Sequence, residues 1–171
     1  MRTVTSLIFC LLFTFIASAQ KKLKIDVTKN GDTIYSTPEE RLYVKAGATK
    51  SRGEHLKCSI YKTNGRYRLH FFIETGRTSV FTIGSGSAAE ITLSDGTVVT
   101  IYSVSNSQSK VSAIAYGAWL YCSYELDYNS RQLLKNSKVT AIRINASMGP
   151  MDYEIKDKFS EVIGEQLGKF H

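Results

Sequence analysis

The chain has few of the residues on which small metal sites and disulfide scaffolds are built. It contains three cysteines, three histidines and two prolines among 171 residues. Cys10 lies in an amino-terminal apolar run, which leaves only Cys58 and Cys122 for the rest of the chain. This supply excludes a disulfide-rich scaffold and a zinc site of the usual ligand spacing, so we expect no metal.

Long apolar runs are also scarce, and the single clear one has the features of an export signal. Arg2 precedes an almost unbroken apolar run at residues 7–16, and small residues at 17–19 offer a signal-peptidase site. The run is about half of the ~20 residues that a membrane-spanning helix needs, so it predicts no transmembrane anchor. Cys10 lies inside the run rather than after it, which argues against lipid attachment. We therefore expect cleavage after Ala19 and a periplasmic or extracellular location.

The remaining composition is that of a soluble globular protein. Hydrophobic residues make up 43% of the chain and charged residues 22%. Residues 20–171 are enough for one domain with its own core. The net charge of +7 falls by one when Arg2 is removed, and such an excess favours encounters with phosphates, acidic glycans or lipid head groups. It also fits a basic surface that is simply solvated.

Three turn dipeptides predict β-hairpins: Asn30-Gly31, Asn64-Gly65 and Asp95-Gly96. A two-residue loop at the middle dipeptide fixes the register of its strands, because alternate side chains face opposite sides of a sheet. Apolar inward residues then meet apolar partners in three pairs, Ile60 with Leu69, Cys58 with Phe71 and Leu56 with Ile73. The same counting in the other two hairpins sets Val27 opposite Ile34 and Leu93 opposite Val98.

Hydrophobic periodicity predicts the other elements. Alternation indicates strands at residues 78–83, 118–128 and 139–146. Ser130 is a candidate cap for a short helix near residue 132. A carboxyl-terminal amphipathic helix, starting between residues 152 and 157, is predicted by apolar residues at three- and four-residue spacing: Phe159, Val162, Ile163, Leu167 and Phe170.

Many strands followed by one packed helix favour a mainly β fold over alternating βαβ units. The expected fold is an antiparallel, immunoglobulin-like β-sandwich with a short helix near residue 132 and a carboxyl-terminal amphipathic helix. Three segments are expected: a signal peptide at 1–19, a β-hairpin and linker at 20–44, and the sandwich domain at 45–171. Polar, glycine- or serine-containing stretches at 45–54 and 103–112 predict long loops.

The later half of the chain carries a loose resemblance to known proteins. Its features are the turn Ser94-Asp95-Gly96, the helical Leu133-Leu134-Lys135, the strand Ile142-Arg143-Ile144, and Asp152-Tyr153-Glu154-Ile155 before the final helix. Over roughly residues 90–170 it resembles small exported β-sandwich proteins of Bacteroidetes-type bacteria, which have no known activity. The resemblance implies a sandwich in a bacterial envelope setting and carries over no site.

No catalytic constellation is evident. Neither His55, His70 nor the terminal His171 accompanies a nucleophile motif, so we assign no catalytic residue. The glycine-containing segment at 84–88 lacks the third glycine and the lysine of a phosphate-binding loop, so we expect no cofactor.

Cys58 and Cys122 both fall on inward faces of predicted strands. An oxidising compartment permits a disulfide between them, and two separate buried thiols are the equal alternative.

The outward face of the middle hairpin is the one constellation with a functional character. The register places Lys57 across from Phe72, Ser59 across from His70, and Tyr61 across from Arg68. The candidate ligand-binding residues are therefore Lys57, Tyr61, Arg66, Arg68, His70 and Phe72. Interleaved cations and rings can hold phosphate or sugar ligands, and the same pairs can instead stabilise the sheet or lie under other structure.

These features favour an exported, non-enzymatic protein that binds an anionic or glycan ligand, or a protein partner, in the cell envelope. Two alternatives stay open. One is a hydrolase acting on envelope or extracellular glycan through a site assembled by loops. The other is an interaction or inhibitor protein that uses an exposed sheet edge. Nucleic acid is not an expected partner, and the sequence leaves the oligomeric state open.

Overall fold

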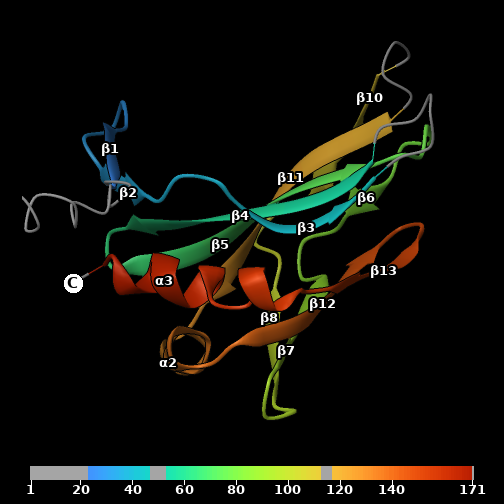
Figure 1. Cartoon of the computed structure of the whole chain (residues 1–171). Coiled ribbons are helices and arrows are strands. Elements are labelled where there is room, and N and C mark those ends of the chain that lie inside the picture. The colour runs from blue at the N-terminus through green and yellow to red at the C-terminus, as the bar shows by residue number, and fades with distance from the viewer. Residues whose placement is uncertain (1–22, 47–52, 113–116, 171) are drawn as a thin grey trace, which may run out of the picture.

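A computed structural model describes residues 23–46, 53–112 and 117–170. This part of the chain is mainly antiparallel β structure with two short α-helices, as the sequence predicts. The strands form a seven-stranded sheet, a four-stranded sheet and a two-stranded ribbon (Figure 1). The expected signal peptide at 1–19 lies outside the described residues.

The seven-stranded sheet is curled into a half-barrel. In Figure 1 the β1–β2 hairpin rises from one end of the sheet and β10 from the other. The order along the sheet is β1 (Lys24–Val27), β2 (Thr33–Ser36), β4 (Glu54–Thr63), β5 (Arg66–Thr75), β11 (Gly117–Leu126) and β10 (Lys110–Ser112), and β3 (Glu40–Lys45) also pairs with β4.

Strands β2 and β3 share one edge of the long strand β4. β2 pairs with residues 61–63 of β4, and β3 pairs with residues 54–58. Thr37, in the segment that connects β2 to β3, is held to β4 by two hydrogen bonds. Its amide donates to the Ile60 carbonyl at 2.9 Å, and its hydroxyl accepts from the Ile60 amide at 2.8 Å. Because β2 and β3 are separate strands, the β1–β2 end of the sheet can curl away from the line of β3.

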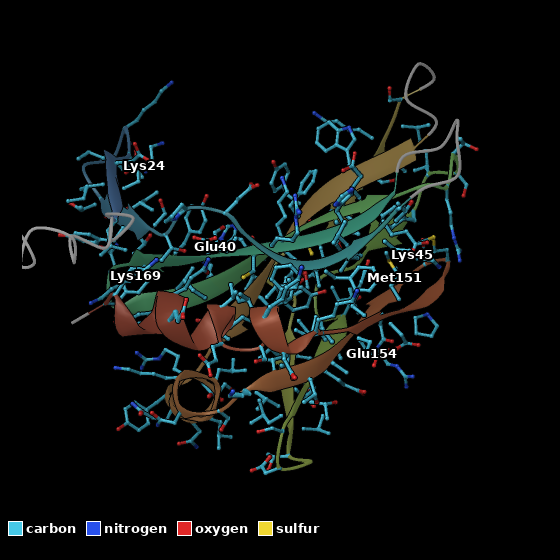
Figure 2. All side chains as sticks on the ribbon, viewed as in Figure 1. Lys24, Glu40, Lys45, Met151, Glu154 and Lys169 are labelled. Carbon is cyan, nitrogen blue, oxygen red and sulfur yellow. The ribbon has the colours of Figure 1, made fainter. Side chains whose placement is uncertain are left out.

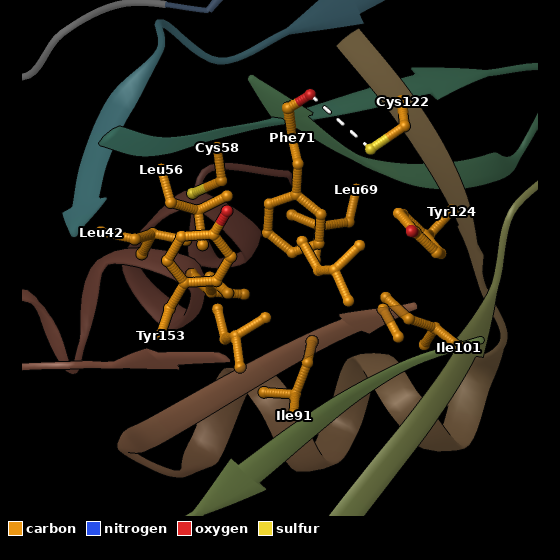
Figure 3. Close-up of a cluster of buried hydrophobic side chains, with 14 of the residues drawn as sticks. Leu42, Leu56, Cys58, Leu69, Phe71, Ile91, Ile101, Cys122, Tyr124 and Tyr153 are labelled. Atoms are coloured by element: carbon orange, nitrogen blue, oxygen red, sulfur yellow. Dashed lines mark hydrogen bonds between the residues drawn. The ribbon is translucent and has the colours of Figure 1, made fainter. Parts of the chain in front are cut away.

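The core lies between the seven-stranded sheet and the four-stranded sheet (Figure 3). The second sheet has the order β13 (Gly149–Glu154), β12 (Val139–Ala146), β7 (Ala88–Leu93) and β8 (Val98–Tyr102), and the ribbon pairs β6 (Thr82–Ile83) with β9 (Ser107–Gln108). Alternate residues of the strands point inward, and among them Leu69, Phe71, Ile91 and Ile144 are fully buried.

The final helix closes one side of the core and is anchored by a buried amide. A short 3-10 turn (Asp157–Phe159) precedes α3 (Val162–Gly168), which packs on β3 and β4. Gln166 is buried on α3, and its Nε2 donates to the carbonyl oxygens of Pro38 and Cys58 at 3.1 and 3.3 Å. The expected carboxyl-terminal helix is therefore confirmed, and a polar tie adds to its apolar stripe of Ile163 and Leu167.

The helix near residue 132 is confirmed, but its cap is different from the predicted one. Helix α2 spans Tyr128–Asn136, and Asp127 is its N-cap. The Asp127 carboxylate accepts from the amide of Ser130 at 2.7 Å, so Ser130 supplies the capped amide and not the cap. This hydrogen bond holds the pKa of Asp127 below its usual value.

The middle hairpin has the predicted register. Asn64 and Gly65 both adopt positive φ, and Ile60, Cys58 and Leu56 lie opposite their predicted apolar partners. A turn with two positive-φ residues matches the twist of the strands that it joins.

The other two hairpins are shifted by one residue from the prediction. Val27 lies opposite Thr33 rather than Ile34, and Val98 lies opposite Thr92 rather than Leu93. One further backbone hydrogen bond closes each hairpin, from Thr28 to Asp32 and from Leu93 to Thr97, so that the loop inside it has three residues, of which only the glycine adopts positive φ. Three-residue loops with a final left-handed glycine are a common alternative to two-residue turns, and the same dipeptide accommodates both.

Three other boundaries also differ from the prediction. The strand predicted at 78–83 is reduced to Thr82–Ile83, and the loop predicted at 103–112 contains β9 and β10. Residues 152–154, a candidate helix start, belong to β13, whose Tyr153 is buried in the core. Most of the loop predicted at 45–54 lies outside the described residues.

Candidate functional site

One face of the seven-stranded sheet is turned away from the core. Inward residues of β4 point toward α3, since the Cys58 thiol donates to Gln166 Oε1 at 3.6 Å. The alternate residues of β4, β5 and β11 therefore project on the opposite side, which we call the outer face. Figure 2 shows side chains standing above the sheet on the side away from α3. The outer face comprises Lys57, Ser59, Tyr61, Thr63, Arg66, Arg68, His70, Phe72, Glu74, Trp119, Tyr121, Ser123 and Glu125.

The curl of the sheet makes a groove at the β1–β2 end of the outer face. The turn of the middle hairpin is tied to the first hairpin by a hydrogen bond from Asn64 Nδ2 to Asp32 Oδ1 at 3.0 Å. The groove has a volume of about 650 Å³ and is lined by Ile34, Tyr61, Thr63, Asn64, Arg66, Arg68 and His70. Four of the six predicted binding residues, Tyr61, Arg66, Arg68 and His70, therefore line one concave surface.

The two arginines of the groove are exposed cations. In the described ranges, neither Arg66 nor Arg68 forms a salt bridge. The neighbouring cation Lys24 differs, because its ammonium group lies 3.0 Å from Asp26. An arginine fork without a carboxylate partner is suited to bidentate binding of a carboxylate, sulfate or phosphate group.

His70 is a neutral member of the groove rather than a cation. Its ring stacks on Tyr61 with centroids 3.9 Å apart, and its Nδ1 lies 3.2 Å from the Ser123 hydroxyl. Burial, and secondarily the positive charge of Arg68, lower the pKa of His70 to about 4. Near neutral pH the imidazole therefore serves as a hydrogen-bonding and stacking group.

The other two predicted residues lie in a cluster of aromatic rings farther along the outer face. Phe72 lies 4.8 Å from Tyr121 and 6.3 Å from Trp119, and the latter two rings are 6.1 Å apart, all between centroids. We call these three rings the aromatic cluster. The ammonium groups of Lys57 and Lys110 lie 5.0 Å above Phe72 and 5.2 Å above Trp119. Such cation–π contacts can also stabilise a sheet.

An acidic residue borders the aromatic cluster. Glu39 lies 3.7 Å from the Lys57 ammonium group. Partial burial and then the charge of Glu39 raise the pKa of the Tyr121 hydroxyl, so the phenol stays protonated. The cluster is thus closer to charge balance than the groove.

Trp119 and Tyr121 also lie on the outer face, but the sequence did not indicate that their strand pairs with the middle hairpin. Alternation along residues 118–128 puts Tyr121 on the outward face of its own strand, away from Leu120 and Cys122. Only the pairing of β11 with β5 brings Tyr121 opposite Phe72 and Ser123 opposite His70. That pairing joins segments about fifty residues apart, and no local turn signals it.

The two cysteines are buried, free thiols in the structure. Both lie opposite Phe71, Cys58 from β4 and Cys122 from β11, so β5 separates them. Two strand spacings give about 9.6 Å between their Cα atoms, whereas a disulfide needs roughly 4.4–6.8 Å. Burial raises the pKa of both thiols, that of Cys122 to about 12, which keeps them protonated and unreactive.

Among the described residues, neither a catalytic triad nor a cluster of metal ligands is found at the site. Within the described ranges, no three His, Cys, Asp or Glu side chains form a candidate metal site. His70 has Ser123 as its hydrogen-bonding neighbour, and none of the residues that line the groove is a carboxylate. A nucleophile and base without an orienting acid do not make a triad.

Comparison with known proteins identifies no relative of this chain. No family model matches the chain, and neither a curated protein nor a solved structure matches it. In the part of the chain that the structure describes, no helix has the length and apolar character needed to cross a membrane.

Proposed function

We propose that this protein binds an acidic glycan on its outer face, as a non-enzymatic protein that is exported to the periplasm or beyond. The observation that carries the proposal is the pair of salt-bridge-free guanidinium groups, Arg66 and Arg68, on a concave surface of about 650 Å³. This volume falls in the range of roughly 300–1,000 Å³ that is usual for ligand sites.

The rest of the groove suits a sugar better than a bare anion. Thr63 and Asn64 offer a hydroxyl and an amide, and Tyr61 with His70 offers a stacked ring pair. Sugars present several hydroxyl groups beside apolar CH faces, so they use both kinds of contact. The arginines then supply the preference for a carboxylate or sulfate substituent.

Binding fits the groove better than hydrolysis does. A glycosidase needs two carboxyl groups beside the bond that it cleaves, one of them with a raised pKa. Asp95 and Asp127 are carboxyl groups whose pKa is shifted, and both are lowered by backbone hydrogen bonds at a turn and a helix cap. Neither lines the groove.

A pair of matched variants tests the proposal. Isothermal titration calorimetry with hyaluronan, polygalacturonate and uncharged dextran should show binding of the acidic polymers only, weakening as salt rises because exposed charges are screened. Arg66→Ser with Arg68→Ser should reduce affinity for the acidic polymers at least about tenfold. The control removes the same charge at two exposed lysines away from the outer face, Lys135 on α2 and Lys156 after β13, and should bind normally. Equal binding by the two double variants would refute the proposal.

One observation favours an exposed sheet edge as a second candidate. β1 is an end strand of the seven-stranded sheet, and its Ile25 and Val27 side chains are 61% and 68% exposed. Such an edge can accept a strand from a partner. If the β1 edge pairs with a second copy of the chain, light scattering should show self-association that Val27→Lys abolishes. A wild-type protein that is monomeric at all concentrations would exclude this self-association.

A further inference from the structure

We infer that the ligand is a linear glycan in which acidic and uncharged sugars alternate, held at the same time by the groove and by the aromatic cluster. The inference rests on the proposed function and adds the aromatic cluster as a second subsite. It follows from two surfaces of different chemistry that lie in line on one sheet.

The two subsites are aligned along β5. Arg66, Arg68, His70 and Phe72 are alternate residues of this strand on the same face. At ~3.3 Å per residue, the Cα atoms of Arg68 and Phe72 are about 13 Å apart, and those of Arg66 and Phe72 about 20 Å. A ligand that contacts both subsites must therefore be extended along the strand.

The middle of the face is continuous and polar. The Ser123 hydroxyl lies next to the Nδ1 atom of His70, and the Tyr61 ring stacks on the imidazole ring. These groups can hydrogen-bond hydroxyl groups without adding a charge, since the imidazole is neutral. A bound polysaccharide can thus extend from the groove to the aromatic cluster and form hydrogen bonds through its hydroxyl groups along the way.

The aromatic cluster offers one largely open ring. Tyr121 is 52% exposed, whereas Lys57 and Lys110 lie over its neighbours Phe72 and Trp119. The electron-rich face of a phenol ring attracts the polarised CH groups on one side of a sugar ring. The Lys110 ammonium group, which lies over Trp119 at the margin, can meet the acidic substituent of an adjacent sugar.

Compact anions do not account for this arrangement. A phosphate ion, or the head group of a lipid, would occupy the groove and leave the aromatic cluster untouched about 13 Å away. A uniformly acidic polymer would place a carboxylate near Glu39, which lies 3.7 Å from Lys57 and already balances its charge. An uncharged sugar at Tyr121 avoids that repulsion.

The test uses hyaluronan oligosaccharides, in which glucuronate alternates with N-acetylglucosamine, and oligogalacturonates of equal length. Calorimetry on the wild-type protein should show affinity rising with hyaluronan length until both subsites are filled, with weaker binding of the oligogalacturonate. Tyr121→Ala should lower affinity for the long hyaluronan oligosaccharide about tenfold or more and leave the disaccharide unaffected, as expected for loss of an aromatic anchor. Tyr128→Ala, at a 65% exposed tyrosine on α2, is the matched control and should bind normally.

The outcomes separate this inference from the proposed function. Binding that depends on Arg66 and Arg68 but is unchanged by Tyr121→Ala and by length would overturn the two-subsite inference alone. Inorganic phosphate or anionic phosphatidylglycerol vesicles binding as tightly as the long oligosaccharide would also overturn it. Loss of the arginine dependence would overturn the proposed function itself.

Discussion

Acidification should destabilise this protein through His70, whose imidazole lies partly buried between Tyr61 and Ser123. Burial and the neighbouring Arg68 lower its pKa from 6.5 to about 4 in the folded state. Between these two values the unfolded chain binds a proton at this residue and the folded protein does not. The stabilising contribution is therefore fully present above about pH 6.5 and is lost as the pH falls toward 4.

The magnitude follows from the two pKa values. One pKa unit corresponds to about 1.4 kcal/mol, so lowering the pH from 7 to 4.5 should cost up to about 2.5 kcal/mol at His70. Solvent reaches part of the ring, which makes this figure an upper bound. Such a loss is a large fraction of the usual stability of a domain.

Urea unfolding followed by the fluorescence of the single tryptophan, Trp119, measures this loss. Carboxyl groups also titrate in this range, so the informative quantity is the difference between wild type and variants that cannot titrate at residue 70. His70→Gln and His70→Phe should both lose up to about 2.5 kcal/mol less than wild type between pH 7 and 4.5. Equal losses in all three proteins would mean that the imidazole has the same pKa in the folded and unfolded states, contrary to this prediction.

Three further predictions concern the packing that supports the outer face. Gly164→Ala should destabilise the fold by about 1–3 kcal/mol, because the added Cβ would lie 3.1 Å from two backbone oxygens of α2. At Gly168 an added Cβ meets no atom within 4 Å, so Gly168→Ala should stabilise the fold by up to ~1 kcal/mol. Thermal unfolding that ranks the two variants the other way would contradict this packing. Gln166→Leu should cost about 1–3 kcal/mol in urea unfolding, because two buried carbonyl oxygens lose their donor, and an unchanged midpoint would show that the tie is dispensable. Residues 20–171 purified without reductant should react with a thiol reagent at Cys58 and Cys122 only after denaturation, and a denatured sample without free thiols would mean that the strands pair differently.

Local signals explain which parts of the fold could be predicted. The Asn64-Gly65 turn and the alternation around it fixed the register of β4 and β5, because a wrong register would have buried polar side chains. The dipeptides at Gly31 and Gly96 did not distinguish two-residue from three-residue loops, so the predicted registers of these two hairpins differ by one residue from those in the structure. β13 was missed because Met151 and Tyr153 alternate over a short stretch that also fits the approach to a helix.

The candidate site was predictable only where it is local. Lys57, Tyr61, Arg66, Arg68, His70 and Phe72 lie on one hairpin, so turn chemistry alone placed them on one face. Ile34 enters the groove through the curl of β2, and Trp119 and Tyr121 through the pairing of β11 with β5. Curl and long-range pairing depend on tertiary packing, for which a single sequence gives no local pattern.

The most direct test of glycan binding at the outer face is a backbone amide NMR titration of residues 20–171 with a long hyaluronan oligosaccharide. Shift changes are expected in β4, β5 and β11, together with the single indole NH resonance, that of Trp119 in the aromatic cluster. The four-stranded sheet and α2 should stay unchanged. Shift changes confined to β12, β13 or α2, or no change at millimolar ligand, would contradict glycan binding at the outer face.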